Sequence, residues 1–261
     1  MQDQVKNWLK DGTIDIFIGY KTCHGHPLPH CFDKAHLHEV DQLVDGPARY
    51  ALEKIAAHLT AHHPGIKIGM LARDCNQRAL KVLTQLNALD DGSVKTIALN
   101  CCPSNLKAHA DCSYLQRRPA GAYKKQVGID SRTPLEDLAS IAPQERLSRW
   151  MYEFEKCIKC YGCRNICPVC CCEDCSLEHA ELIGAGRLPP DVPLFHLVRA
   201  VHMAGRCIDC GLCEDACPAD IPLRLLYREV NAIFKNLFDY TAGVSGGPSP
   251  FNMIGEYKPL N

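Results

Sequence analysis

The sequence predicts an α/β domain followed by a cysteine-rich domain of the α+β class. Apolar runs alternate with helical patterns through about the first hundred residues, and cysteines then recur at fixed spacing from Cys157 to Cys217. At 261 residues the chain is long enough for two domains. We expect the α/β domain at 1–140, the cysteine-rich domain at 141–240 with an insert at 168–206, and an extended tail at 241–261.

The first domain is expected to be a small parallel sheet covered by helices. Apolar runs predict strands at 14–20, 66–72 and 94–99, and helical spacing predicts helices at about 47–62 and 79–86. Strands that alternate with helices form parallel sheets. Cys75 and the pair Cys101 and Cys102 follow two of these strands, so we expect them at the carboxyl edge of the sheet, where such sheets place their sites.

The second domain is expected to lie between two helices. A polar stretch at 117–140 predicts a linker, and helical patterns follow at 143–155 and 222–237. The later helix is predicted to bury one apolar face, made of Leu226, Val230, Ile233, Phe234 and Leu237. Metal ligands rather than apolar periodicity would organise the chain between these helices.

Composition argues against several classes of partner. The net charge of -1 gives no field that would gather nucleic acid or an anionic membrane. The N-terminus lacks the features of a secretory signal, and no apolar run approaches membrane-spanning length, so we expect a cytoplasmic protein without membrane insertion. Eighteen cysteines in such a chain indicate metal or redox chemistry rather than a disulfide framework.

Eight of the cysteines form one pattern that occurs twice, 50 residues apart. Each copy has three cysteines at intervals of three and a fourth followed by proline, at Cys167-Pro168 and Cys217-Pro218. In bacterial two-cluster ferredoxins this run gives three ligands to one 4Fe-4S cluster and the fourth to the other. We therefore predict one cluster on Cys157, Cys160, Cys163 and Cys217, and a second on Cys207, Cys210, Cys213 and Cys167.

Zinc is the alternative metal for these motifs, because paired Cys-x-x-Cys sequences also form structural zinc sites. A zinc site needs only four ligands, usually as two separated pairs. It does not explain three consecutive cysteines followed by Cys-Pro in two identical copies. The pattern therefore favours iron–sulfur clusters in a two-cluster ferredoxin-like domain.

The insert between the motifs carries further candidate ligands. Cys170, Cys172 and Cys175 could supply three soft ligands, and Cys75 or Cys102 could complete a third iron–sulfur site. Buried free thiols or an adventitious zinc are the alternatives, and spacing alone does not separate them.

Three further groups have weaker patterns. The tract from Cys23 to His38 is rich in His and Cys, which indicates either a metal site or a solvated loop near a subunit interface. The turn around Cys75 begins a helix, where amides can receive an anion or lower a thiol pKa, although a ligand or packing role is favoured. His196, Arg199 and His202 share one helical face, where they would hydrogen-bond cluster sulfur or pack.

Several segments resemble a known family of iron–sulfur proteins, related to the beta subunits of coenzyme F-420 hydrogenases and formate dehydrogenases. They are 15–20, 40–44, 73–79, 157–175 and 194–207. The resemblance implies an intracellular electron-transfer subunit of anaerobic bacteria or archaea, beside formate dehydrogenase, hydrogenase or heterodisulfide-reductase-like partners. The family usually has Gly-Cys-Asp where this sequence has Asp74-Cys75-Asn76, which is a departure at this turn. Some members bind FAD, but no flavin contact is assigned here.

The sequence contains no phosphate-binding glycine motif, so the electron donor is expected to come from another protein. We expect a non-catalytic electron-transfer subunit, with no catalytic residue of its own, in a larger anaerobic oxidoreductase complex whose other subunits carry flavin or metal centres. One alternative is a flavin-containing subunit that itself oxidises or reduces a soluble cofactor. The other is a structural zinc-binding assembly protein.

Overall fold

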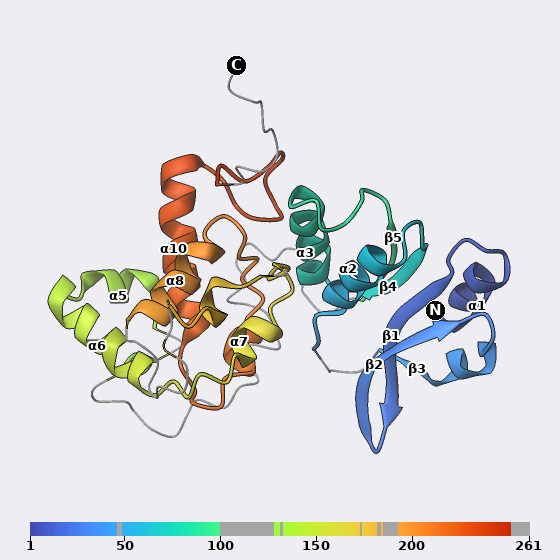
Figure 1. Cartoon of the computed structure of the whole chain (residues 1–261), viewed down its shortest axis with the longest axis horizontal. Coiled ribbons are helices and arrows are strands. Elements are labelled where there is room, and N and C mark those ends of the chain that lie inside the picture. The colour runs from blue at the N-terminus through green and yellow to red at the C-terminus, as the bar shows by residue number, and fades with distance from the viewer. Residues whose placement is uncertain are drawn as a thin grey trace. The chain divides into compact units, whose positions relative to one another are not determined.

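The computed structural model describes residues 1–45, 49–99, 128–130, 133–172, 174–181, 184 and 193–251. The described residues belong to two compact units (Figure 1). The first lies within Met1–Leu106 together with Gly246–Pro248, and the second within Lys107–Ser245 together with Ser249–Phe251.

The first unit is a mixed β-sheet with helices. Its strands are β1 (Ile16–Cys23), β2 (His26–Asp33), β3 (Leu43–Val44), β4 (Ile68–Ala72) and β5 (Val94–Ala98). The order is β2-β1-β4-β5, and β3 also pairs with β1. Strand β4 is parallel to both β1 and β5, which confirms the predicted parallel core. The helices are α1 (Gln2–Lys10), a 3-10 helix (Leu37–Gln42), α2 (Leu52–His62) and α3 (Asp74–Gln85).

The sheet differs from the predicted one because β2 and β3 pair with β1 in the antiparallel direction. No apolar pattern predicts β2, whose eight residues include Pro27 and Pro29. Proline lacks an amide N–H and is tolerated where the strand lies at a sheet edge. Strand β2 is such an edge, so the prolines are compatible with the pairing that the apolar pattern did not predict.

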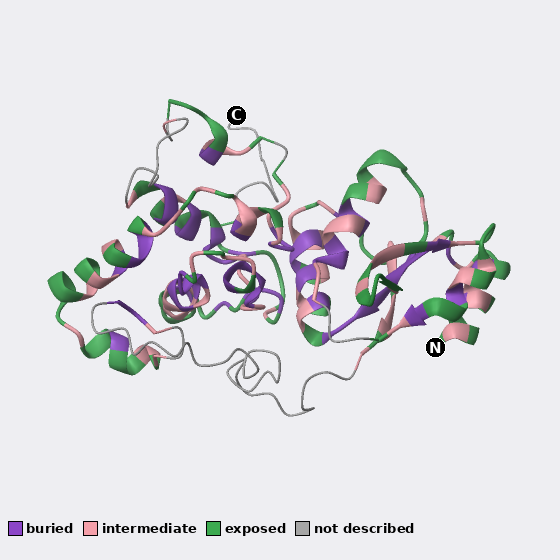
Figure 2. Ribbon diagram, turned by 90° about the horizontal axis from the view of Figure 1, so that it is seen from below, coloured by how far each residue is buried: buried purple, intermediate pink, exposed green. Residues whose placement is uncertain are grey.

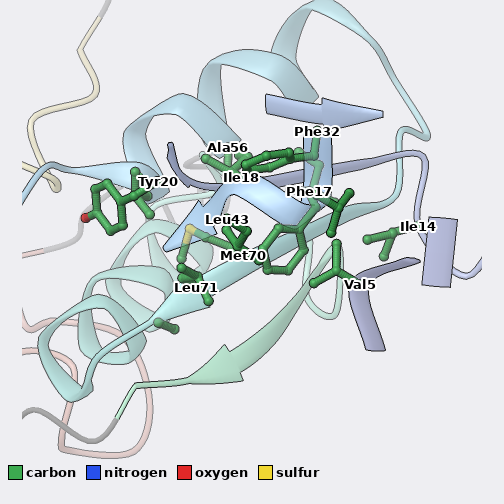
Figure 3. Close-up of a cluster of buried hydrophobic side chains, with 14 of the residues drawn as sticks. Val5, Ile14, Phe17, Ile18, Tyr20, Phe32, Leu43, Ala56, Met70 and Leu71 are labelled. Carbon is green, nitrogen blue, oxygen red and sulfur yellow. The ribbon is translucent and has the colours of Figure 1, made fainter. Parts of the chain in front are cut away.

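The core of the first unit gathers side chains from the sheet, α1 and α2 (Figure 3). Its largest members are fully buried: Tyr20, Phe17, Phe32, Leu9, Ile14, Ile18, Leu52, Ile68, Met70 and Leu71. All five residues of β4 are buried, as expected for a strand flanked by two others and covered by helices. This packing holds the carboxyl end of β4, where α3 begins, in a fixed place.

The described part of the second unit consists of helices and turns, with no strand among them. Its helices are α5 (Leu135–Ser140), α6 (Pro143–Glu155), α7 (Gly162–Asn165), a 3-10 helix (Ser176–Glu178), α8 (Leu194–Met203), α9 (Leu212–Asp215) and α10 (Leu223–Phe238). The predicted helices at 143–155 and 222–237 are confirmed as α6 and α10. The strand component of the predicted α+β class is not seen in this described part.

Helix α10 buries only part of the predicted apolar face (Figure 2). Ile233 and Leu237, both assigned to the core, are 59% and 69% exposed. The residues actually buried on α10 are Leu223, Leu225, Leu226, Tyr227 and Phe234. The buried Tyr227 hydroxyl is the polar member of this face, and apolar periodicity cannot identify it.

The chain after α10 packs back on that helix. Tyr240 and Ser249 are buried, and the ring of Phe251 lies 4.8 Å from the ring of Phe234. No helix in the described part of the chain has the length and apolar character needed to cross a membrane.

Candidate metal centre

The two cysteine motifs have the same backbone conformation. In the first motif Lys159 and Tyr161 have positive φ, at 52° and 56°, and in the second Asp209 and Gly211 do so, at 54° and 80°. These are equivalent positions 50 residues apart. Positive φ is unfavourable for residues other than glycine and is retained where the surroundings require it. The repetition indicates that both loops are shaped for the same purpose.

Backbone amides of the first loop point at its own sulfur atoms. The Lys159 amide donates to Cys157 Sγ at 3.4 Å, and the Gly162 amide donates to Cys160 Sγ at 3.5 Å. The left-handed residues turn the chain so that these N–H groups face the sulfurs. Hydrogen bonds of this kind stabilise a thiolate and tune a bound metal cluster.

The structure brings Cys217 into the neighbourhood of the first motif. The pKa of the Cys157 thiol is raised to about 11, mainly by burial, with contributions from Cys163, Cys217 and Cys160. Burial likewise raises the pKa of Cys163, Arg199 opposes the increase, and Cys217, Cys160 and Cys167 add to it. Cys217 therefore lies close enough to raise the pKa of thiols in the first motif, although more than 50 residues separate it from them in sequence.

In the same way, Cys167 of the first motif lies near the cysteines of the second motif. The pKa of Cys207 is raised to about 12, mainly by burial, with contributions from Asp209 and Cys167. Burial also raises the pKa of Cys213, with Cys210, Cys207 and Cys167 contributing. Each three-cysteine loop thus has the fourth cysteine of the other motif near it. This proximity is compatible with the two predicted quartets, which stay a prediction.

Close contact between the loops holds this arrangement. Helices α7 and α9 contact each other, and a Cβ added to Gly162 would lie 3.1 Å from the Ala216 carbonyl oxygen. Glycine therefore allows the first loop to approach the turn that carries Cys217. The equivalent residue of the second motif is Leu212, which is buried, so the two halves differ at this contact.

The donor set fits iron–sulfur clusters. All eight donors are thiols, the soft ligands that hold such clusters. Among the described residues, no three His, Cys, Asp or Glu side chains converge as they would around a single metal ion. Burial raises the pKa of four of them, Cys157, Cys163, Cys207 and Cys213, so cluster binding would release protons from these thiols and affinity would rise with pH.

The insert cysteines point toward different neighbours within the second unit. The Sγ atom of Cys170 accepts a hydrogen bond from Arg199 Nη1 at 3.8 Å, whereas Cys175 packs against the buried pair Leu177 and Phe195. Burial raises the pKa of Cys171, and the neighbouring Cys172 adds to this. Cys75 belongs to the first unit and Cys102 lies outside the described residues, so the third site stays a prediction.

Helix α8 buries two of the three polar residues that the sequence places on one face. His196 and Arg199 are 1% and 2% exposed, whereas His202 is exposed. Burial and the charge of Arg199 lower the pKa of His196 to about 4, so this imidazole is neutral near pH 7. His196 stacks on Phe154 with ring centroids 4.7 Å apart, which gives it a packing role.

A buried polar network lies at the carboxyl end of β4 in the first unit. The Arg73 amide donates to Asn76 Oδ1 at 2.9 Å, and Asn76 Nδ2 donates to Glu53 Oε2 at 2.8 Å. Arg73 Nη1 donates to the Tyr20 hydroxyl at 3.3 Å. The sequence analysis identified this turn but missed the network. Asn76 stands at position N3 of a capping box, and that position could have indicated a hydrogen-bonding role for its side chain. Cys75 is half-buried there, and burial raises the pKa of its thiol.

The His/Cys tract that begins at Cys23 forms the β1–β2 hairpin, so the expectation of a loop is wrong. Cys23 pairs with His26 across the strands. His30 hydrogen-bonds to a carboxylate oxygen of Glu39 at 2.9 Å, and Cys31 is exposed. Within the described residues these side chains do not converge on a metal position.

Comparison with known proteins agrees with this site. Residues 200–222 match the family Fer4, described as "4Fe-4S binding domain", and they contain four of the motif cysteines, Cys207, Cys210, Cys213 and Cys217. The fold and the cysteine motifs therefore define an iron–sulfur protein with a 4Fe-4S binding domain.

Two curated relatives are more specific. The chain is 41% identical over 108 residues to a protein of Methanocaldococcus jannaschii named F420-dependent formate dehydrogenase subunit beta. It is 33% identical over 176 residues to one of Methanococcus maripaludis named F420-dependent formate dehydrogenase 1 subunit beta. These matches cover 41% and 67% of this chain, but only 28% and 41% of the relatives. The chain is thus similar to iron–sulfur proteins named as formate dehydrogenase beta subunits, and it spans less than half of their length.

Proposed function

We propose that this chain is the iron–sulfur relay subunit of a larger cytoplasmic oxidoreductase complex. It would carry single electrons between redox centres of other subunits through two 4Fe-4S clusters in a ferredoxin-like domain. The observation that carries the proposal is the crossed neighbourhood of the two motifs, with Cys217 acting on Cys157 and Cys163, and Cys167 acting on Cys207 and Cys213. Crossed ligation would hold the two clusters close enough for rapid electron exchange.

The ligand sets follow from the two quartets. One cluster would be held by Cys157, Cys160, Cys163 and Cys217, and the other by Cys207, Cys210, Cys213 and Cys167. When bound, the clusters would supply one-electron transfer. The chain would contribute thiolate ligands, amide donors such as those of Lys159 and Gly162, and burial of the site. We assign no acid–base catalyst, and we propose that the domain at 1–140 is a docking platform.

The partners are proposed by chemical class. The relatives are named as beta subunits of formate dehydrogenases that depend on F420. We therefore propose that this chain works beside a formate dehydrogenase-, hydrogenase- or heterodisulfide-reductase-like subunit that carries a flavin or a metal centre. Bound FAD in the purified chain would instead favour a subunit that itself reacts with a soluble cofactor.

Metal content is the first test of the proposal. Iron, acid-labile sulfide and zinc would be measured on the full chain purified without oxygen. We expect about eight irons and eight sulfides per chain for two 4Fe-4S clusters. About twelve irons would add a third cluster on Cys170, Cys172 and Cys175, completed by Cys75 or Cys102. Little iron with much zinc would overturn the proposal.

Crossed ligation is tested by comparing three cysteine variants. Cys217→Ser should alter the EPR signal of the dithionite-reduced chain as Cys160→Ser does, because both cysteines would bind one cluster. Cys210→Ser should alter the other component. Cys31→Ser, an exposed cysteine of the first unit, is the matched control and should leave the spectrum unchanged. Agreement of Cys217→Ser with Cys210→Ser would contradict the crossed arrangement.

A further inference from the structure

Arg199 is a buried cation between the two cysteine motifs. It lies on α8 and is 2% exposed. Its Nη2 atom donates to the Cys163 carbonyl oxygen at 2.8 Å, and its Nη1 atom donates to Cys170 Sγ at 3.8 Å. The guanidinium carbon is 5.7 Å from the centre of the Tyr227 ring. One side chain thus contacts the first motif, the insert and α10.

No carboxylate pairs with this guanidinium among the residues that the structure describes. Its contacts are a carbonyl oxygen, a sulfur atom and an aromatic ring. A buried charge without a counter-charge is costly, so such groups are usually paired. The negative charge that Arg199 needs must therefore come from groups that can become anionic close by.

The surrounding groups that can supply this charge are Tyr227, the insert cysteine Cys170 and cysteines of both motifs. Burial alone would lower the pKa of Arg199, but Tyr227, Cys167, Cys163 and Cys170 together raise it above its ordinary value. Arg199 in turn acts to lower the pKa of Cys213. Cys163 belongs to the first quartet, while Cys167 and Cys213 belong to the second. The positive charge is therefore shared between the two proposed ligand sets.

We propose that the guanidinium of Arg199 is a fixed positive charge that raises the reduction potentials of both clusters. The inference rests on the proposed two-cluster function and adds a residue that sets the driving force for electron transfer to the clusters. One-electron reduction by the partner's donor adds one negative charge beside Arg199, and no proton need move because arginine stays charged. A nearby cation stabilises that added charge, most strongly in a buried, low-dielectric site. The neighbouring His196 is neutral and does not share this role.

The rival explanation is purely structural: Arg199 would only clamp α8 to the first loop through the Cys163 carbonyl. The two roles respond differently to substitution. Arg199→Lys keeps the charge but loses the planar fork that reaches two acceptors. Arg199→Gln keeps a hydrogen-bond donor and loses the charge. A charge effect separates these variants, whereas a clamp effect makes them alike.

The test is an EPR-monitored redox titration of the full chain. For Arg199→Gln we expect both midpoint potentials to become more negative, with the equilibrium constant for reduction falling about tenfold, which is about 59 mV for one electron. Arg199→Lys should retain most of the wild-type potentials. Arg149→Gln is the matched control, since Arg149 lies on α6, pairs with Glu145 and has a 36% exposed side chain. Its potentials should not change.

Unchanged potentials in Arg199→Gln, or equal shifts in the lysine and glutamine variants, would overturn the inference. If the glutamine variant loses its iron while the lysine variant keeps it, rescue by charge supports the inference. Loss of iron in both would show that shape rather than charge matters and would also overturn it. Wild-type chain with far fewer than about eight irons would instead refute the proposed function itself.

Discussion

Arg224 holds the carboxylate of Asp209 with two hydrogen bonds, from Nε at 2.7 Å and from Nη2 at 3.1 Å. Asp209 is the left-handed residue between Cys207 and Cys210, and the ion pair ties this loop to the first turn of α10. Both side chains are largely buried, at 11% and 14% exposure. The pair therefore fixes the loop that would hold three ligands of the second cluster.

Arg224→Ala should loosen this loop. It leaves the largely buried Asp209 carboxylate with the more distant Arg228, at 3.9 Å, so we expect the second unit to lose about 2 kcal/mol of stability. Chemical denaturation measures this loss, and iron release to a chelator should be faster. Asp209→Asn combined with Arg224→Ala should cost less than the sum of the single changes. Strict additivity would show that the contact does not stabilise the loop.

Gly205→Ala should be strongly destabilising. Gly205 has φ of +68°, and a Cβ there would clash with Ser249 Oγ and lie 2.8 Å from the Phe234 ring. Strain and overpacking together should cost about 2–4 kcal/mol, measured by denaturation. Gly246→Ala is the control because a Cβ at Gly246 meets nothing within 4 Å. Equal stability of the two variants would mean that the chain after α10 does not pack at Gly205.

Much of the fold could be predicted from the local periodicity of apolar residues. The apolar runs at 66–72 and 94–99 correspond to β4 and β5, and the helix at 143–155 corresponds to α6 residue for residue. Strand β2 was not predicted because its prolines and histidines interrupt any apolar pattern. Its pairing with β1 is possible because β2 lies at the edge of the sheet, where proline is tolerated. Edge position is a property of the assembled sheet, which a local sequence window does not contain.

The candidate site could also be predicted only in part. Ligand spacing alone predicts that the eight motif cysteines form two quartets, because cluster geometry imposes that spacing. The sequence put Arg199 on the correct helical face but could not show that its charge lacks a carboxylate partner in the described residues. The crossing contact of Gly162 with Ala216 was also invisible, since it joins residues 54 apart that meet only through packing.

Glu53 should make the first unit less stable as pH rises. Burial raises the pKa of this carboxyl from 4.5 to about 7 in the folded chain, despite the hydrogen bond from Asn76. Between about pH 4.5 and pH 7 the folded state therefore holds one more proton than the unfolded state, so stability falls across this window and remains lower above it. The full difference corresponds to about 3 kcal/mol.

Glu53→Gln removes this dependence because an amide does not ionise. We expect the variant to be more stable than wild type at about pH 8, by up to about 3 kcal/mol, and similar at about pH 4.5. Denaturation would be followed by Trp8 fluorescence in a Trp150→Phe background, so that the only tryptophan reports on the first unit.

Glu39→Gln is the matched control and should have the opposite sign. Hydrogen bonds from His30 and Lys21 lower the pKa of Glu39 to about 2, so its ionised form favours the folded state near neutral pH. Its neutral replacement should therefore reduce stability at about pH 8, whereas the Glu53 variant gains it. A Glu53→Gln effect that is the same at about pH 5 and pH 8 would show that Glu53 is ionised in the folded chain throughout this range. The network with Asn76 and Arg73 would then have to stabilise a buried carboxylate rather than a carboxylic acid.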